Sequence, residues 1–252
     1  MNNENSYSVI LPTLNEVGHI NSLIKDISNN FDKFNIEYEI IIVDDNSVDG
    51  TVEEILKIDN PRIIIHKRIG KKKSLVESLN EGINISKNEN IIWMDADFSH
   101  PPNYIEKFIK IKNEKNIDVI VCSRFLKEST RYYNAQNKKK AGINFLSNFL
   151  NKICKLFLFG DFTDYTSGFI CIRKKIIKNI KLKGYYGDYF IILITKCKLA
   201  NYNVLEIPFK EKERASGNSK TTGSKISLII KCFFYLIALN KCIFKKIFKV
   251  SF

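Results

Sequence analysis

The sequence lacks the paired cysteines and the leader that are typical of small exported or zinc-stabilised domains. Its six cysteines form no CxxC pair, and no histidine lies at zinc-ligand spacing from them, which argues against a disulfide framework and a structural zinc site. The first residues, MNNENS, contain no basic segment followed by an apolar one. We therefore expect no signal peptide before Tyr7 and reduced thiols in a cytosolic setting. With 44% hydrophobic and 27% charged residues, the chain is expected to fold and not to remain disordered.

Acidic residues are scarce in two parts of the sequence. Glu128 is the only acid between Asp118 and Asp161, and after Glu213 no acid occurs while seven lysines follow. An AT-rich genome would explain the total charge of +13 equally well, but it would not segregate the charges. Segregated positive charge beside apolar residues indicates an anionic partner, either a membrane surface or a nucleic acid.

No apolar run is long enough to cross a membrane. The most apolar stretch, from Ile226 to Leu239, is only 14 residues long, whereas a spanning helix needs about 20 apolar residues. The basic stretch KCIFKKIFKV follows it. We therefore expect residues 226–252 to form an apolar and basic interfacial helix that holds the chain on the cytoplasmic face of a membrane, as a peripheral or monotopic protein. A C-terminal helix that packs into the core is the alternative.

Short β-branched runs alternate with helical patterns in the first half of the chain. Helical spacing is clearest for Ile20, Leu23, Ile24 and Ile27. We expect an α/β fold with a mostly parallel, Rossmann-like sheet and flanking helices. The expected strands are 7–11, 38–43, 62–66, 90–94 and 117–122, with 168–172 and 203–207 after a basic, loosely amphipathic stretch at 126–158. Ligands of such a sheet bind beyond the carboxyl ends of the strands, which selects the loops 12–16, 44–50, 67–73 and 95–102.

Acidic side chains follow two of the expected strands. Asp95 and Asp97 come directly after the run NIIWM. Two carboxylates so spaced at a strand end can hold a hard divalent cation against the phosphates of a nucleotide. Asp44 and Asp45 follow the run YEIIIV, where carboxylates can accept hydrogen bonds from a ribose or a base. The alternative for the second pair is a loop that caps a helix beginning near Thr51.

Together with four other segments, these motifs resemble glycosyltransferase family 2, and within it the polyprenyl-phosphate (dolichyl-phosphate) mannosyltransferases. The resemblance implies a GT-A domain over residues 1–225 and Mg²⁺ or Mn²⁺ as the cofactor. It also implies inverting transfer of a hexose from a nucleotide diphosphate sugar, with GDP-mannose favoured, to a polyprenyl phosphate. A nucleic-acid-binding protein, the alternative of another class, would leave the acidic motifs unexplained. The segments are ILPTLNE (10–16), VDDNSVDGT (43–51), MDADFSHPP (94–102), SRF (123–125), DYTSGF (164–169) and ERASGNSK (213–220).

The resemblance assigns roles to residues by position. Asp97 would be the principal metal ligand, Asp95 would contact the metal and the nucleotide, and Arg124 would face the diphosphate or the acceptor phosphate. Arg214 and Lys220 would hold phosphates from a glycine-containing loop, which we expect to close over the diphosphate. The expected nucleoside contacts are Pro12, Glu16, Asp44 and Asp45, and Ser167 belongs to the acceptor-side motif.

Departures from the family pattern leave the sugar and the acceptor open. Leu14 stands where tyrosine is common, and Ile192 stands where a glutamate is expected, with Asp188 as the nearest acid. A phosphate-monoester nucleophile is already largely ionised near neutral pH, so catalysis can rest on alignment and charge stabilisation without a strong base. The alternative functions are transfer of glucose or an N-acetylhexosamine from a UDP-sugar to a lipid phosphate or to a glycan.

The three histidines receive separate predictions. His100 lies beside the Asp95–Asp97 motif and is considered as a contact of the metal or the diphosphate. His19 is expected at an exposed helix position, and His66 at the end of a strand.

Overall fold

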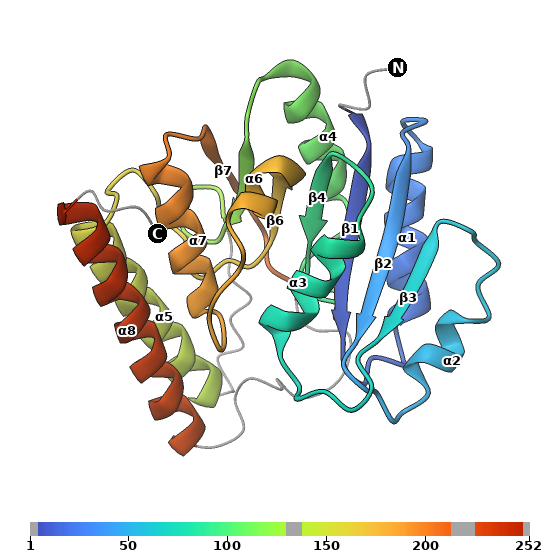
Figure 1. Cartoon of the computed structure of the whole chain (residues 1–252), viewed down its shortest axis with the longest axis horizontal. Helices are drawn as coiled ribbons and strands as arrows, with labels where there is room; N and C mark the ends of the chain where they lie inside the picture. Colours follow the sequence, from blue (N-terminus) through green and yellow to red (C-terminus); the bar gives the residue numbers. More distant parts are fainter. Residues whose placement is uncertain (1–4, 130–137, 213–224, 249–252) are drawn as a thin grey trace.

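The computed structural model describes residues 5–129, 138–212 and 225–248, which fold around one seven-stranded sheet (Figure 1). The strand order is β3-β2-β1-β4-β6-β5-β7. Neighbouring strands are parallel except at β6, which is antiparallel to both β4 and β5. The expected mostly parallel α/β sheet is therefore confirmed, with one reversed strand that the sequence pattern did not predict. The strands are β1 Tyr7–Thr13, β2 Tyr38–Asp44, β3 Ile63–Lys67, β4 Asn90–Trp93, β5 Val119–Ser123, β6 Ile170–Arg173 and β7 Val204–Pro208.

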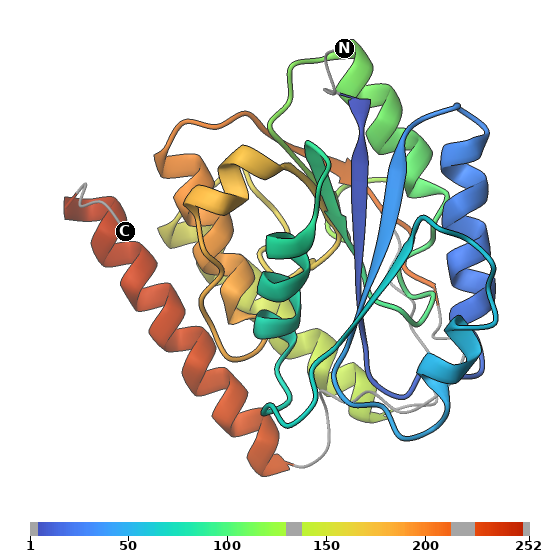
Figure 2. The same cartoon turned by 45° about the vertical axis from the view of Figure 1, so that its right-hand side comes forward.

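Helices cover both faces of the sheet (Figures 1 and 2). The neighbouring residues Ile10 and Leu11 of β1 are both fully buried, one in each of two hydrophobic clusters on opposite faces. Strands buried on both faces need apolar residues at successive positions, which explains the continuous β-branched runs in the sequence. The helices are α1 Ile20–Asp32, α2 Thr51–Ile55, α3 Leu75–Ile85, α4 Tyr104–Glu114, α5 Lys138–Phe157, α6 Lys174–Asn179, α7 Asp188–Leu199 and α8 Lys225–Phe248.

Helix α3 approaches the sheet closely through Gly82. A Cβ atom at this position would lie 2.6 Å from Cγ2 of Ile10 and 3.1 Å from Cγ2 of Val43. Such distances are too short for a methyl group, so the missing side chain sets the spacing between α3 and the sheet. This spacing matters for the site because the loop before α3 ends beside β2.

Helix α8 has one face in the core and one face uncovered. It lies along α7 and beside α5 (Figures 1 and 2), and Ala238, Leu239 and Cys242 are buried against its neighbours. Lys246 near its end donates to the backbone oxygen of Phe157, at 3.3 Å, and to that of Leu158. The alternative prediction, a C-terminal helix that packs into the core, is therefore correct for one face of α8.

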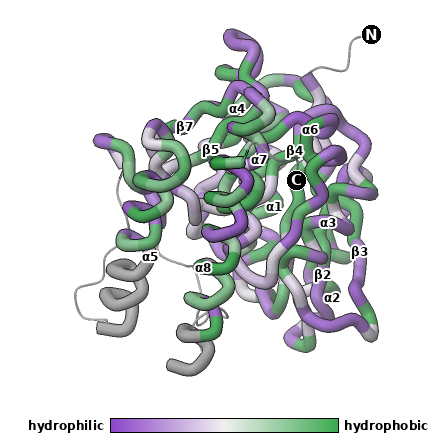
Figure 3. Tube along the Cα trace, turned by 60° about the vertical axis from the view of Figure 1, so that its left-hand side comes forward, coloured by the Kyte–Doolittle hydropathy of each residue, from purple (hydrophilic) through white to green (hydrophobic). Residues whose placement is uncertain are grey.

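The other face of α8 carries exposed apolar side chains. They are Ile230, Phe233, Leu236, Phe244, Ile247 and Phe248, and α5 adds exposed Phe149, Leu156 and Phe157. Figure 3 shows hydrophobic residues along both helices. Over the described ranges, no helix is both long and apolar enough to cross a membrane.

Candidate functional site

The carboxyl ends of β1, β2 and β4 lie side by side at one edge of the sheet. Thr13 at the end of β1 pairs with Asp44 at the end of β2, and β4 lies on the other side of β1. The loops that carry Glu16, Asp45 and the Asp95–Asp97 motif therefore leave the sheet next to one another. This arrangement brings together the acidic motifs that the sequence placed after separate strands.

Side-chain hydrogen bonds tie the loop after β1 to the loop after β2. The backbone N–H of Asn15 donates to Oγ of Ser47 at 2.8 Å, and that of Glu16 donates to Oγ1 of Thr51 at 2.8 Å. Val17 donates from its backbone to Oδ2 of Asp49 at 3.1 Å. These contacts fix the position of Glu16, whose side chain is 12% exposed at the site edge. Pro12, also expected at the nucleoside, lies partly buried within β1.

His19 ties the same loop to the Asp95–Asp97 motif. Its Nε2 lies 2.9 Å from the backbone oxygen of Ala96 and 3.1 Å from Oε2 of Glu16. The residue is 7% exposed, so the expected exposed helix position is wrong. His19 was misplaced because its partner Ala96 is far away in the sequence. His66 does lie in β3, as expected, and its Nε2 is 2.6 Å from Oε2 of Glu81.

The two acids after β2 have different surroundings. The carboxylate of Asp44 accepts from Oγ1 of Thr13 at 2.9 Å and from both the backbone N–H and the hydroxyl of Ser47, at 2.9 and 2.5 Å. Asp44 is 1% exposed, and these bonds give it the task of holding the turn. Asp45 accepts from the backbone N–H of Ser74 at 2.7 Å and from the guanidinium of Arg68. The contact of either carboxylate with a nucleoside stays a prediction.

The Asp95–Asp97 motif forms a tight turn directly after β4. The backbone N–H of Asp95 donates to Nδ1 of His100 at 2.9 Å, and Oδ1 of Asp97 accepts from the backbone N–H of Ser99 at 3.0 Å. Phe98 between them has a positive φ of 64°. The motif therefore has a fixed backbone, with Asp95 partly exposed and Asp97 3% exposed.

The buried ring of His100 supports this turn from behind. It stacks on Phe169 with centroids 4.8 Å apart and planes 9° apart, and it meets Phe209 edge-on at 5.6 Å. Because Nδ1 accepts from Asp95 and the ring is packed between aromatic side chains, the structure gives His100 a positioning role. A direct contact of His100 with the metal or the diphosphate stays a prediction.

The donor set at the turn fits a hard divalent cation that is shared with a nucleotide. Within the part of the chain that the structure describes, no group of three or more His, Cys, Asp or Glu side chains could hold a metal. Two carboxylates with the remaining positions filled by water and phosphate oxygens are the usual environment of Mg²⁺ in nucleotide sites. Asp95 and Asp97 match that pattern, and Mn²⁺ accepts the same oxygen ligands.

Arg124, after β5, is held in a buried ion pair. Its Nε and Nη2 donate to the two carboxylate oxygens of Asp164 at 2.8 and 2.9 Å, and Nη2 also donates to the backbone oxygen of Thr166 at 2.7 Å. Burial alone would raise the pKa of Asp164, but the charge and hydrogen bonds of Arg124 outweigh it and lower that pKa. Nη1 lies 3.7 Å from Oε1 of Glu211. The guanidinium is thus largely occupied within the protein, and its contact with a phosphate stays a prediction.

The remaining predicted site residues divide into two groups. The hydroxyl of Ser167 donates to the backbone oxygen of Cys122 at 2.5 Å and accepts from the N–H of Phe169 at 3.2 Å. Ser167 therefore holds the turn before β6, where Gly168 has a positive φ of 75°. Arg214 and Lys220 lie outside the described residues.

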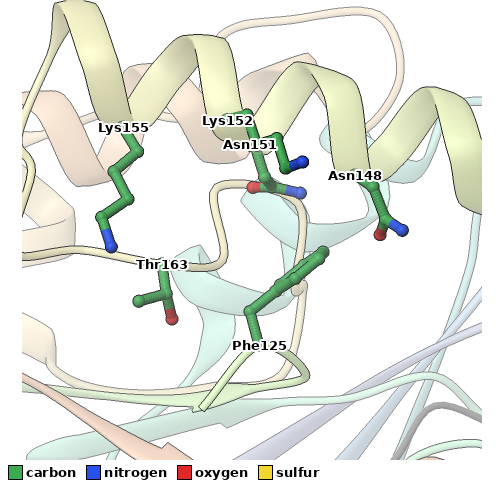
Figure 4. A pocket seen from close by; sticks show the side chains of 6 residues that line it. All are labelled: Phe125, Asn148, Asn151, Lys152, Lys155 and Thr163. Carbon is green, nitrogen blue, oxygen red and sulfur yellow. The ribbon is translucent and has the colours of Figure 1, made fainter.

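A cavity of about 400 Å³ borders the Arg124 cluster under α5. Figure 4 shows side chains of α5 around it, opposite Phe125 and Thr163. Asn151 connects it to the cluster, because its Nδ2 donates to Oγ1 of Thr166 at 3.0 Å. Two lysines are among the described residues that line it, which are Phe125, Asn148, Asn151, Lys152, Lys155 and Thr163.

Two residues near the site were missed from the sequence. Tyr189 in α7 accepts from Nε1 of Trp93, at the end of β4, at 3.2 Å, and Arg68 pairs with Asp45. Asp188, the nearest acid to the missing glutamate, accepts from the backbone N–H groups of Tyr185 and Tyr186. Its carboxylate therefore closes the turn before α7. Local patterns did not reveal the Tyr189–Trp93 and Arg68–Asp45 pairs, because in each pair the two residues lie on different elements.

Comparison with known proteins places the chain in a family. The model of glycosyl transferase family 2 matches residues 8–181. A dolichol-phosphate mannosyltransferase of Pyrococcus furiosus is 32% identical over 224 residues, which is 87% of this chain, and the chain spans 60% of that relative. An uncharacterised protein of Methanocaldococcus jannaschii is 30% identical over 89% of this chain and 90% of its own length.

Solved structures agree on the fold. Glucosyl-3-phosphoglycerate synthase of Mycobacterium tuberculosis, in complex with Mn²⁺, UDP-glucose and phosphoglyceric acid, matches with a TM-score of 0.69. The match covers 95% of this chain and 80% of that one at 16% identity. The same enzyme with Mg²⁺ and UDP gives a TM-score of 0.68. The chain has the GT-A fold, belongs to glycosyl transferase family 2 and is similar to a dolichol-phosphate mannosyltransferase.

Proposed function

We propose that the chain transfers a hexose, with mannose favoured, from a nucleoside diphosphate sugar to a polyprenyl phosphate. The observation that carries this proposal is the convergence of Glu16, Asp45, Asp95 and Asp97 at the carboxyl ends of three adjacent strands. The similarity to a dolichol-phosphate mannosyltransferase over most of the chain supports the acceptor class and mannose as the sugar. We propose GDP-mannose as the donor.

The residues of the site would divide the work between binding and positioning. Asp97 and Asp95 would hold Mg²⁺ or Mn²⁺, which neutralises charge on the diphosphate leaving group when bound. Structures of the related fold contain these same ions. Glu16 and Asp45 would contact the nucleoside, with Pro12 beside them in β1. Arg214 and Lys220 would add positive charge at the phosphates as developing charge appears on the leaving group.

The acceptor side would lie near Arg124 and the cavity under α5. Lys152 and Lys155 make this side positive, which suits a phosphate monoester. The acceptor phosphate is already ionised and needs only to be aligned with the anomeric carbon for in-line attack. Ile192 in place of the expected glutamate is compatible with such a reaction, because no strong general base is required.

The uncovered faces of α5 and α8 support a peripheral position on a membrane. Exposed apolar side chains occur on both helices, among them Phe157 on α5 and Phe244 on α8. Lys152, Lys155 and Lys241 are exposed on the same two helices. Apolar burial and attraction between lysines and anionic lipids together can hold a protein at a bilayer surface. We propose the cytoplasmic face, which brings the site close to a phosphate headgroup that cannot leave the bilayer.

A donor screen tests the proposed function. Purified full-length protein is incubated with Mn²⁺ or Mg²⁺, a short-chain polyprenyl phosphate, and GDP-mannose, UDP-glucose or UDP-N-acetylglucosamine in parallel. Mass spectrometry of the lipid fraction should show a glycosyl phosphate with GDP-mannose. A glycosyl lipid formed only from a UDP-sugar would replace the donor, and transfer to soluble glycans with no glycosyl lipid would overturn the acceptor.

A further inference from the structure

Tyr189 lies in the first turn of α7 with its hydroxyl group beside the end of β4. The hydroxyl oxygen accepts from Nε1 of Trp93, the last residue of β4, at 3.2 Å. The Asp95–Asp97 motif begins two residues after Trp93. The aromatic ring packs in the core, and Tyr189 is 3% exposed. The hydrogen bond therefore holds the end of this side chain at the strand end from which the acidic turn leaves.

The hydrogen bond from Trp93 leaves the hydroxyl proton of Tyr189 for another partner. An indole N–H can only donate, so the phenolic oxygen is the acceptor in this pair and its own O–H points elsewhere. The hydrogen bonds of residues 5–129, 138–212 and 225–248 include no acceptor for that proton. A buried donor without an acceptor is costly. An acceptor supplied by a ligand would remove this cost.

The turn before β6 leaves space near the hydroxyl. Gly168 in this turn has a positive φ of 75° and carries no side chain. A Cβ atom built on Gly168 would lie 3.8 Å from the Tyr189 hydroxyl, and apart from its chain neighbours it would have no other neighbour within 4 Å among the described residues. The hydroxyl therefore faces a position that this turn leaves without a side chain.

The charges near the hydroxyl favour a neutral ligand group. Burial raises the pKa of Tyr189, the hydrogen bond from Trp93 opposes this change, and the negative charges of Asp95 and Asp188 add to it. The hydroxyl thus stays protonated at neutral pH and acts as a donor. Negative charge on this side disfavours a direct contact with a phosphate oxygen. A sugar hydroxyl suits the position, because it can accept from Tyr189 and donate to a carboxylate.

We infer that Tyr189 is a specificity-determining residue whose O–H donates to a ring hydroxyl of the donor's hexose. Trp93 is the positioning residue, because its indole N–H sets the direction of that O–H. The proposed function assigns the diphosphate to Asp95 and Asp97, and the hexose is joined to that diphosphate. The inference rests on this placement of the nucleoside diphosphate sugar.

Binding of a nucleotide with and without its sugar tests the inference. Isothermal titration of the full chain with Mn²⁺ gives Kd values for GDP and GDP-mannose, or for UDP and UDP-glucose if the donor screen selects that sugar. Tyr189→Phe keeps the ring and removes the hydroxyl. The Kd for the nucleotide sugar should rise by about 3- to 10-fold, as expected for the loss of one neutral hydrogen bond. The Kd for the nucleotide alone should stay the same.

Analogues of the nucleotide sugar that lack one ring hydroxyl each identify the contacted group. For wild-type protein, loss of that hydroxyl should weaken binding by the same factor as Tyr189→Phe. The variant should bind that analogue and the complete nucleotide sugar equally well, because the interaction is already absent. A purely structural role of Tyr189 would not produce this pattern.

Tyr165→Phe is the matched control. Tyr165 is also fully buried, and its hydroxyl donates to the backbone oxygen of Phe159 and accepts from the N–H of the same residue, both at 3.0 Å. Its loss should lower Tm and leave both Kd values unchanged. Trp93→Phe, which removes the orienting N–H, should weaken the nucleotide sugar more than the nucleotide. It replaces Tyr189→Phe if thermal melting shows that variant to be unfolded.

The outcomes separate the inference from the proposed function. If wild-type protein binds the nucleotide sugar and folded Tyr189→Phe binds it equally well, the inference is wrong. An equal loss of affinity for the nucleotide and the nucleotide sugar would also overturn it, because the hydroxyl would then support the site in general. If wild-type protein binds no nucleotide and no nucleotide sugar, the proposed function fails and the inference fails with it.

Discussion

Replacing Asp97 by Asn tests the metal assignment with little disturbance of the fold. Oδ1 of Asp97 accepts from the backbone N–H of Ser99 at 3.0 Å, and the amide oxygen of asparagine can accept the same hydrogen bond. The side chains have nearly the same shape, and the residue is 3% exposed, so the turn should persist. The substitution therefore removes the charge of the proposed metal ligand while it preserves the hydrogen bond to Ser99.

The expected loss follows from the composition of the site. Only Asp95 would remain as a carboxylate ligand, and a neutral amide is a much weaker ligand for a hard cation. Turnover at saturating donor should fall by about 10²-fold or more, which corresponds to about 2.7 kcal/mol in the activation free energy. The Mn²⁺ concentration needed for half-maximal rate should rise in the same variant.

The assay is initial-rate transfer to a short-chain polyprenyl phosphate over a series of Mn²⁺ concentrations. Asp49→Asn is the control. Asp49 accepts hydrogen bonds from the backbone N–H of Val17 and from the N–H and hydroxyl of Thr51. It lies at the same edge of the sheet but does not belong to the metal motif. It should change stability more than metal dependence. Near-normal turnover of Asp97→Asn with an unchanged Mn²⁺ requirement would refute the reasoning.

Three further predictions concern stability and membrane binding. Asp164→Asn should lower the free energy of unfolding by about 3 to 5 kcal/mol in urea denaturation, because buried Arg124 loses its bidentate partner and keeps the more distant carboxylate of Glu211, at 3.7 Å. Burial alone would raise the pKa of Asp164, and Arg124 lowers it on balance. The wild-type pair therefore stabilises the fold above the unfolded pKa of about 3.9, and this stabilisation is lost as the pH falls through the lower folded value. Gly82→Ala should cost about 1 to 3 kcal/mol and lower Tm, because the new methyl overlaps the sheet. The double variant Phe233→Ser, Phe244→Ser should bind anionic vesicles about 10²-fold or more weakly, as measured by co-sedimentation. Each exposed ring would contribute about 1.5 to 3 kcal/mol to the binding free energy on burial in lipid.

Matched controls make these predictions refutable. Asp161→Asn removes the ion pair between Asp161 and Lys198. Because Asp161 is 70% exposed, the free energy of unfolding should change by less than about 1 kcal/mol. Leu56→Ser removes an exposed apolar side chain beside α2 and should leave vesicle binding unchanged. An unchanged urea midpoint for Asp164→Asn, a Gly82→Ala protein as stable as wild type, or full vesicle binding by the double phenylalanine variant would each contradict its prediction.

The sequence was sufficient for features that depend on local pattern. Continuous β-branched runs predicted strands buried on both faces, and the order of motifs predicted that Asp45 and the Asp95–Asp97 turn lie at the same sheet edge. Both follow because carboxyl ends of parallel strands share an edge whatever the details of packing.

Features that depend on distant partners could not be predicted in this way. The direction of β6 is not encoded in ICIR, because a short apolar strand can pair with its neighbours in either orientation. Arg124 was expected to face a phosphate, and its pairing with Asp164 depends on a loop 40 residues later in the chain. Helix α8 has one face in the core and one exposed face. The first half of its sequence is apolar on almost all sides, so the sequence pattern did not indicate which side packs against the core.

Two long helices that lie side by side have a mechanical consequence for an enzyme at a surface. A single helix that lies on a bilayer can rotate about its own axis, and the domain attached to it would then move toward or away from the lipid. The 24-residue α8 is about 36 Å long at 1.5 Å per residue, and α5 beside it provides a second line of support. Because α8 is also packed against α7, any tilt of α5 and α8 relative to the membrane would tilt the sheet with them. On a membrane, the two helices would therefore set the height and angle of the strand ends above the headgroups. The reacting phosphate would then lie at a constant depth relative to the site.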